Sequence, residues 1–79
     1  MSSYNGWRNR ETWNVSLWIG NDEPLYRAAV EYAREAKRPT YRGLVAYLGL
    51  TGKTPDGVGW TSRKLSHREL TQMVQELVS

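Results

Sequence analysis

The chain has 79 residues, enough for one small domain and too few for a second hydrophobic core. It contains no cysteine, which excludes disulfides and thiolate metal sites, so its four tryptophans and five tyrosines are expected to supply the buried area. Eleven basic residues against eight acidic ones give a formal net charge of +3, which permits contact with nucleic acid without requiring it.

The chain lacks the apolar segments that membrane insertion and secretion need. The longest uninterrupted apolar run is the five residues 44–48, far below the roughly 20 that cross a membrane as a helix. The opening residues, MSSYNGW, have neither the basic nor the apolar region of a signal peptide. These features predict a soluble, cytoplasmic protein without a membrane partner.

Residues 1–8 are expected to form a partly ordered lead-in to a first helix, which Asn9 caps and Gly20 ends after about Ile19. The apolar side chains of this helix are spread around its axis, which predicts the central helix of the core. They are Trp13, Val15, Leu17, Trp18 and Ile19. The small polar residues between them, Thr12, Asn14 and Ser16, are expected to be satisfied locally.

A second, amphipathic helix is predicted over residues 22–38, because its apolar stripe repeats at helical spacing and Pro39 ends it. Thr40 then caps a third helix, which Gly49 or Gly52 closes.

Residues 51–64 are predicted to be a turn-rich loop, in which residues 58–61 are either extended or irregular. The last helix begins after Ser66, which forms a predicted capping box with Glu69. The fold class is therefore all-α: a single small domain, residues 1–79, of about four short helices around a Trp/Tyr-rich core.

Catalytic and metal-binding patterns are sparse. The single histidine, His67, has no partner in the sequence that marks it as a base, and the carboxylates show no ligand spacing. We therefore expect a non-catalytic protein without a cofactor or a metal.

Binding is better supported by two basic clusters. One contains Arg34, Lys37, Arg38 and Arg42, and the other contains Arg63, Lys64 and Arg68. Each is either a solvated helix end or a contact surface. Trp7 and Trp60 fall in loop-like segments, where they are either lids over the core or interface anchors of the kind that Trp and Arg form. The candidate contact residues are Trp7, Arg8, Arg38, Arg42, Arg63 and Lys64.

The segment NRETWNVSLWIGND, together with YNGW before it and TPDGV-W after it, resembles a family of small uncharacterised proteins of phages, prophages and plasmids. Its core is N-x-E-T-W-N-V-x-L-W-I-x-N-D, which residues 9–22 match. The resemblance implies a small accessory protein of a mobile element and supplies no functional residues. The short, tryptophan-rich build is similar to that of host-defence inhibitors such as anti-CRISPR proteins.

The sequence leaves three binding hypotheses open. The first is a protein that occupies a surface on a host protein or complex, and the second is a small DNA- or RNA-binding protein that uses the basic clusters. The third is a homodimer that pairs exposed tryptophans; otherwise the chain is expected to be a monomer.

Overall fold

The computed structural model describes residues 4–78, so the lead-in residues 1–3 lie outside the described part. Four helices follow one another: α1 (Arg10–Asn21), α2 (Glu23–Glu35), α3 (Tyr41–Leu48) and α4 (His67–Glu76). The helix α4 packs against the other three, and α2 packs against α1 and α3. The all-α prediction is confirmed.

The first helix ends at Asn21, about two residues later than the sequence predicts. Asn9 caps it as expected, because its Oδ1 accepts a hydrogen bond from the Thr12 N–H at 2.8 Å. Gly20 does not end it: the Asp22 N–H still donates to the Trp18 carbonyl at 3.0 Å, so Gly20 lies inside the last turn. Asp22 is the residue that separates α1 from α2, since its side chain caps α2 by accepting from the Leu25 N–H.

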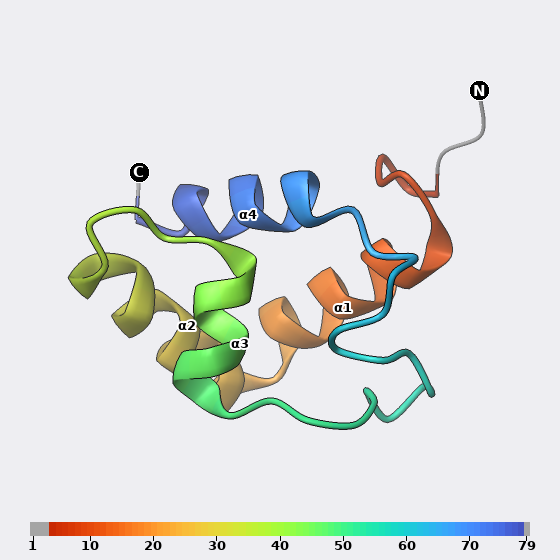
Figure 1. Cartoon of the computed structure of the whole chain (residues 1–79), viewed down its shortest axis with the longest axis horizontal. Helices are drawn as coiled ribbons and strands as arrows, with labels where there is room; N and C mark the ends of the chain where they lie inside the picture. Colours follow the sequence, from red (N-terminus) through yellow and green to blue (C-terminus); the bar gives the residue numbers. More distant parts are fainter. Residues whose placement is uncertain (1–3, 79) are drawn as a thin grey trace.

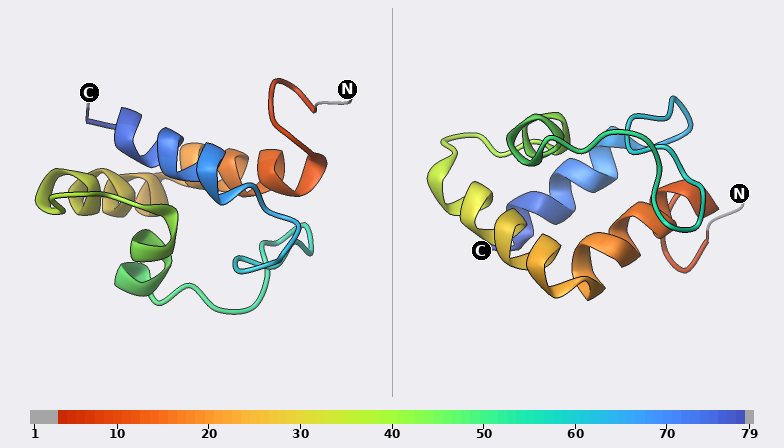
Figure 2. Two further views of the ribbon diagram at one scale, coloured as in Figure 1. Left: turned by 45° about the horizontal axis from the view of Figure 1, so that its top comes forward. Right: turned by 90° about the horizontal axis from the view of Figure 1, so that it is seen from below.

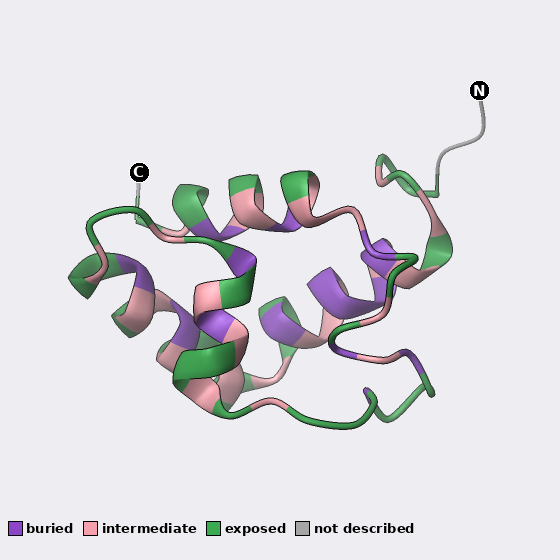
Figure 3. Cartoon of the chain, viewed as in Figure 1, coloured by how far each residue is buried: buried purple, intermediate pink, exposed green. Residues whose placement is uncertain are grey.

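The helix α1 contributes to the core as predicted, but it does not bury all of its apolar side chains. Val15 and Ile19 are fully buried, but so are Thr12 and Asn14, whereas its two tryptophans, Trp13 and Trp18, are only half-buried. Figure 3 shows buried positions along much of α1. The small polar residues are therefore the ones that face the interior, where they need partners.

The second helix ends at Glu35, three residues before the predicted Arg38. Its last capping bond runs from the Ala36 N–H to the Tyr32 carbonyl at 2.9 Å. Pro39 explains the early end, because a proline in the helix lacks an N–H for the Glu35 carbonyl and also disfavours helical geometry at the preceding residue.

The remaining cap predictions hold with one exception. Thr40 caps α3, and Gly49 closes it in the left-handed conformation with φ +64°. Ser66 caps α4 by accepting from the Glu69 N–H at 3.3 Å. The reciprocal half of the predicted capping box is missing, because the Ser66 N–H donates to Thr12 Oγ1 instead.

The connection between α3 and α4 runs from α3 to the N-terminal end of α1 before it returns to α4 (Figures 1 and 2). Within residues 4–78 it contains no strand, since the pairing of Lys53 with Gly59 is an isolated bridge. Residues 58–61 are therefore irregular.

The core is mostly aliphatic. Its fully buried members include Val15, Ile19, Leu44, Leu70 and Val74. Tyr41 and Trp60 are the aromatic residues of this core, and Trp7, Trp18 and Tyr32 pack against it from partly exposed positions. The Tyr41 hydroxyl donates to the Trp60 carbonyl at 2.6 Å, which fixes the long connection against α3.

Candidate binding surface

Two of the three sequence segments that carry the family resemblance, residues 9–22 and 54–60, meet in a polar network between α1 and the long connection. Asn14 Nδ2 donates to Asp56 Oδ2 at 2.8 Å, and the Thr54 hydroxyl donates to Asn14 Oδ1 at 2.7 Å. The Trp18 indole N–H donates to the same Asp56 oxygen at 2.9 Å. Asn14 and Thr54 are buried, so these bonds satisfy groups that water does not reach.

This network changes the acidity of Asp56. The hydrogen bond from Asn14 is the largest cause that lowers its pKa, followed by the bond from Trp18, and the charge of Arg10 adds to both. Partial desolvation acts in the opposite direction without reversing the shift. The folded structure therefore stabilises the ionised, carboxylate form of Asp56.

A second set of bonds holds the N-terminal segment against the start of α4. The Arg8 N–H donates to Glu69 Oε1 at 2.8 Å, and Asn9 Nδ2 donates to the Lys64 carbonyl at 2.7 Å. The Thr12 hydroxyl donates to Asn9 Oδ1 and accepts from the Ser66 N–H at 2.9 Å. Residues 8–12 are therefore fixed beside residues 64–69, although more than 50 residues separate them in sequence.

A tight turn places the residues just before α1. Tyr4 and Trp7 exchange two backbone hydrogen bonds, of 2.6 and 2.8 Å, around Asn5 and Gly6. Both central residues have positive φ, as a type I′ turn requires. The Asn-Gly pair is the sequence signal for this turn. The turn sets the Tyr4 ring against Trp13, with 4.9 Å between the centroids, and brings Trp7 onto the core.

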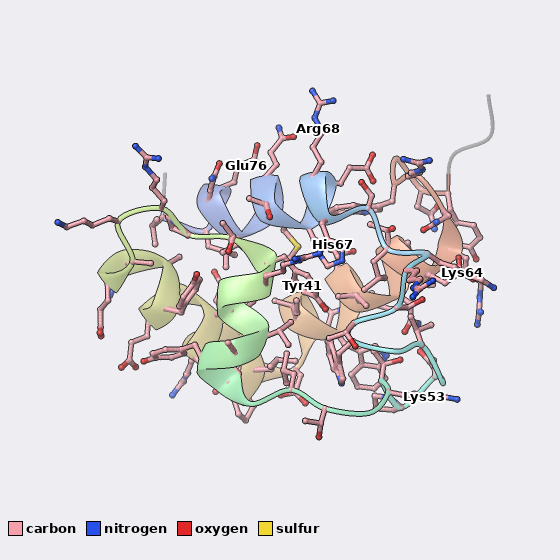
Figure 4. All side chains as sticks on the ribbon, viewed as in Figure 1. Tyr41, Lys53, Lys64, His67, Arg68 and Glu76 are labelled. Carbon is pink, nitrogen blue, oxygen red and sulfur yellow. The ribbon has the colours of Figure 1, made fainter. Side chains whose placement is uncertain are left out.

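These contacts bring four of the six predicted contact residues to one end of the molecule. We call the set Trp7, Arg8, Arg63 and Lys64 the N-terminal basic surface. Trp7 is half-buried and the other three are exposed. Figure 4 places Lys64 beside the beginning of α1. Arg10, which the sequence analysis did not select, is also exposed at this end of α1.

The other two predicted residues lie elsewhere. Arg38 is exposed in the connection between α2 and α3. Figure 1 shows this connection at the opposite end of the long axis from residues 60–65. Arg42 is exposed in the first turn of α3 and lines a cleft with Thr61 and His67. Arg68, from the second predicted cluster, points away from the body of the protein (Figure 4). The structure thus separates residues that the sequence groups together.

The basic side chains are largely without acidic partners. Among residues 4–78, the one ion pair within 4.0 Å joins Arg27 to Glu23 on α2, at 2.8 Å. Two carboxylates near this end of the molecule are engaged with neutral donors: Glu69 with the Arg8 N–H, and Asp56 with Asn14 and Trp18. Trp7 itself lines a hollow together with Glu69 and Glu76. The charges of Arg8, Arg63 and Lys64 therefore remain directed to solvent.

Trp60 is 6% exposed and belongs to the core, so it is a lid of the kind that the sequence analysis considered. No group of three or more His, Asp or Glu within the described residues could hold a metal ion. Among the helices that the structure describes, none combines the length and apolar character that a bilayer crossing requires.

The fold and this surface define a small all-helical protein with an exposed basic end that two distant segments form together. The chain belongs to a family of unknown function, "Family of unknown function (DUF7249)", whose model matches residues 1–79. The predicted membership of an uncharacterised family is thereby confirmed. We found no match to the chain among curated proteins or among solved structures.

Proposed function

We propose that this protein is a non-catalytic binding protein that uses its N-terminal basic surface to occupy an acidic surface on a host protein or complex. The observation that carries the proposal is the convergence of Trp7, Arg8, Arg63 and Lys64 at one end of the fold. Tryptophan and arginine are the residue types that dominate binding energy at protein interfaces. Three exposed cations and a half-buried indole at the same end of the fold are the chemistry that an acidic, partly apolar partner surface would match.

The local structure supports this use of the surface. Arg8 and Lys64 take part in the scaffold through main-chain atoms alone, the Arg8 N–H and the Lys64 carbonyl. Their side chains make no contribution to these bonds and are free to contact a partner. A rigid backbone with free charged side chains lowers the ordering cost of binding.

The resemblance to proteins of phages and plasmids adds the biological setting to the proposal. A small accessory protein of a mobile element acts in the cytoplasm of a host cell, and inhibition or modulation of a host defence complex is the action that we propose for it. This part of the proposal rests on similarity of motif, size and composition.

The test is an affinity capture with the tagged, full-length protein from a bacterial lysate, with and without nuclease, read by mass spectrometry. A protein complex that survives nuclease and is lost with Arg8→Ala/Lys64→Ala supports the proposal. Retention of every partner by that variant contradicts it.

Direct binding of DNA or RNA is the alternative, and the shortage of ion pairs among the basic residues is the observation that favours it. It predicts captured material that disappears with nuclease. It also predicts an affinity that falls with salt, with a slope of about −0.9 per duplex phosphate contacted.

A further inference from the structure

A cleft of about 310 Å³ lies between α3 and the residues that lead into α4. One wall is a face of α3, formed by Tyr41, Arg42, Val45 and Ala46, whose spacing places them side by side on the helix. Thr61 and His67 form the opposite wall. Figure 4 shows His67 beside Tyr41, and their ring centroids are 5.5 Å apart. The volume is at the lower end of the range for small-molecule sites, about 300–1,000 Å³.

Two residues that line the cleft have polar groups that the fold does not use. Arg42 is exposed and forms no ion pair within residues 4–78. His67 Nδ1 is buried and has no hydrogen-bond partner in that part of the chain. The Tyr41 hydroxyl, in contrast, is already bonded to the Trp60 carbonyl, so Tyr41 contributes only the side of its ring. A buried polar atom without a partner is uncommon in a folded protein, and here it belongs to a residue that lines the cleft together with an exposed guanidinium.

The charge of this region is positive without a local acid to balance it. No Asp or Glu from the described residues lines the cleft. An adjoining hollow shares His67 and is lined by Arg68, Thr71, Gln72 and Gln75, again without a carboxylate. Each of the two hollows that His67 lines thus has one arginine in its lining, Arg42 in the cleft and Arg68 in the adjoining hollow. A guanidinium binds a phosphate through two parallel hydrogen bonds, which gives it an advantage over other cations for this anion.

We propose that the cleft binds a small organic phosphate of the mononucleotide class. Arg42 contacts the phosphate, with the Thr61 hydroxyl and the His67 ring as additional hydrogen-bond partners. Val45 and Ala46 provide the apolar wall against which the body of the ligand rests. The site is separate from the N-terminal basic surface, so it does not depend on the function proposed above.

The test is a ¹⁵N-NMR titration of the full-length protein with adenosine 5′-monophosphate, inorganic phosphate and adenosine as probes. The monophosphate is expected to shift the amide signals of residues 41–46, 61 and 67 in a saturable way. Inorganic phosphate should bind more weakly at the same residues, and adenosine should leave them unchanged. Arg42→Gln should lower the affinity for the monophosphate by about tenfold or more, because the substitution removes a charged hydrogen-bond donor.

The matched control is Arg38→Gln, which removes the same charge from an exposed position outside the cleft. The affinity of this variant for the monophosphate should stay within about twofold of the wild type, since Arg38 is exposed and does not line the cleft. Equal weakening by both variants, or no saturable shift at the cleft, overturns the proposal. Inorganic phosphate that binds as tightly as the monophosphate overturns the assignment of an organic ligand. A loss of binding in Arg8→Ala/Lys64→Ala would move the site to the other surface.

Discussion

Replacement of Asn14 by alanine is the most direct perturbation of the network that joins α1 to the long connection. The side chain is 1% exposed and makes two hydrogen bonds, to Asp56 and from Thr54. Each bond is worth about 1 kcal/mol. The hydroxyl of Thr54, a residue that is only 3% exposed, would lose its acceptor at an additional cost of about 1–3 kcal/mol. We expect the free energy of unfolding to fall by about 2–4 kcal/mol, allowing for partial relaxation around the site.

That loss is large for a domain of this size. A chain of 79 residues has a total stability of about 4–12 kcal/mol, so Asn14→Ala should lower the melting temperature by about 10–25 °C. Urea unfolding followed by tryptophan fluorescence gives the free energy, and circular dichroism gives the melting temperature. Asn21→Ala is the control: it changes the same residue type at an exposed position of the same helix and should stay within about 0.5 kcal/mol.

A double-mutant cycle separates the hydrogen bond from the general cost of truncation. Thr54→Val in the Asn14→Ala background should cost less than in the wild type, by about 1 kcal/mol, because the hydroxyl is already without its acceptor. The reasoning is refuted if Asn14→Ala costs no more than Asn21→Ala, or if the two substitutions at Asn14 and Thr54 are additive.

Three further predictions follow from single contacts. The pKa of Asp56 is lower in the folded state than in the unfolded chain, where it is about 3.9. The Asp56 carboxylate therefore stabilises the fold fully at pH values above the unfolded pKa, and this stabilisation is lost as the pH falls through the folded pKa. Asp56→Asn should therefore flatten the decline of the urea midpoint below about pH 4; an unchanged acid profile would contradict this. Gly43→Ala should destabilise the fold by about 1–3 kcal/mol, because a Cβ at this position overlaps a tyrosine side chain. At Gly20 an added Cβ meets no atom within 4 Å, so Gly20→Ala should be neutral or stabilise the fold by up to about 1 kcal/mol. Equal thermal shifts in the two alanine variants would rule out the steric explanation. Tyr41→Phe should cost about 1–3 kcal/mol in urea unfolding, because the Trp60 carbonyl loses its donor, and a neutral result would show that this bond does not stabilise the fold.

The fold was largely predictable because its signals are local. Asn9, Asp22, Thr40 and Ser66 each cap a helix, and such capping depends on residues within three positions of the cap. The errors are also local. Gly20 does not end α1, because a glycine inside a helix costs only about 1 kcal/mol relative to alanine.

The site was less predictable because it depends on contacts between distant segments. Nothing in the sequence pairs Asn14 with Thr54, or Asn9 with the Lys64 carbonyl, although these bonds decide which basic residues lie together. Glu69 fits a capping box by spacing, yet its carboxylate binds the Arg8 N–H instead. The Asn5-Gly6 turn could have been found, since this dipeptide strongly favours a type I′ turn.

The central claim is that the N-terminal basic surface is the contact surface, and the most direct measurement compares charge-matched variants in the same capture experiment. Arg8→Ala/Lys64→Ala removes two charges from that surface while both main-chain hydrogen bonds remain. Arg34→Ala/Lys37→Ala removes two charges from exposed positions, one in the last turn of α2 and one just after the helix. Equal circular dichroism spectra would establish that both variants are folded. We predict that the first variant loses the captured partner and that the second retains it. Equal retention, or equal loss, in the two variants would contradict the account.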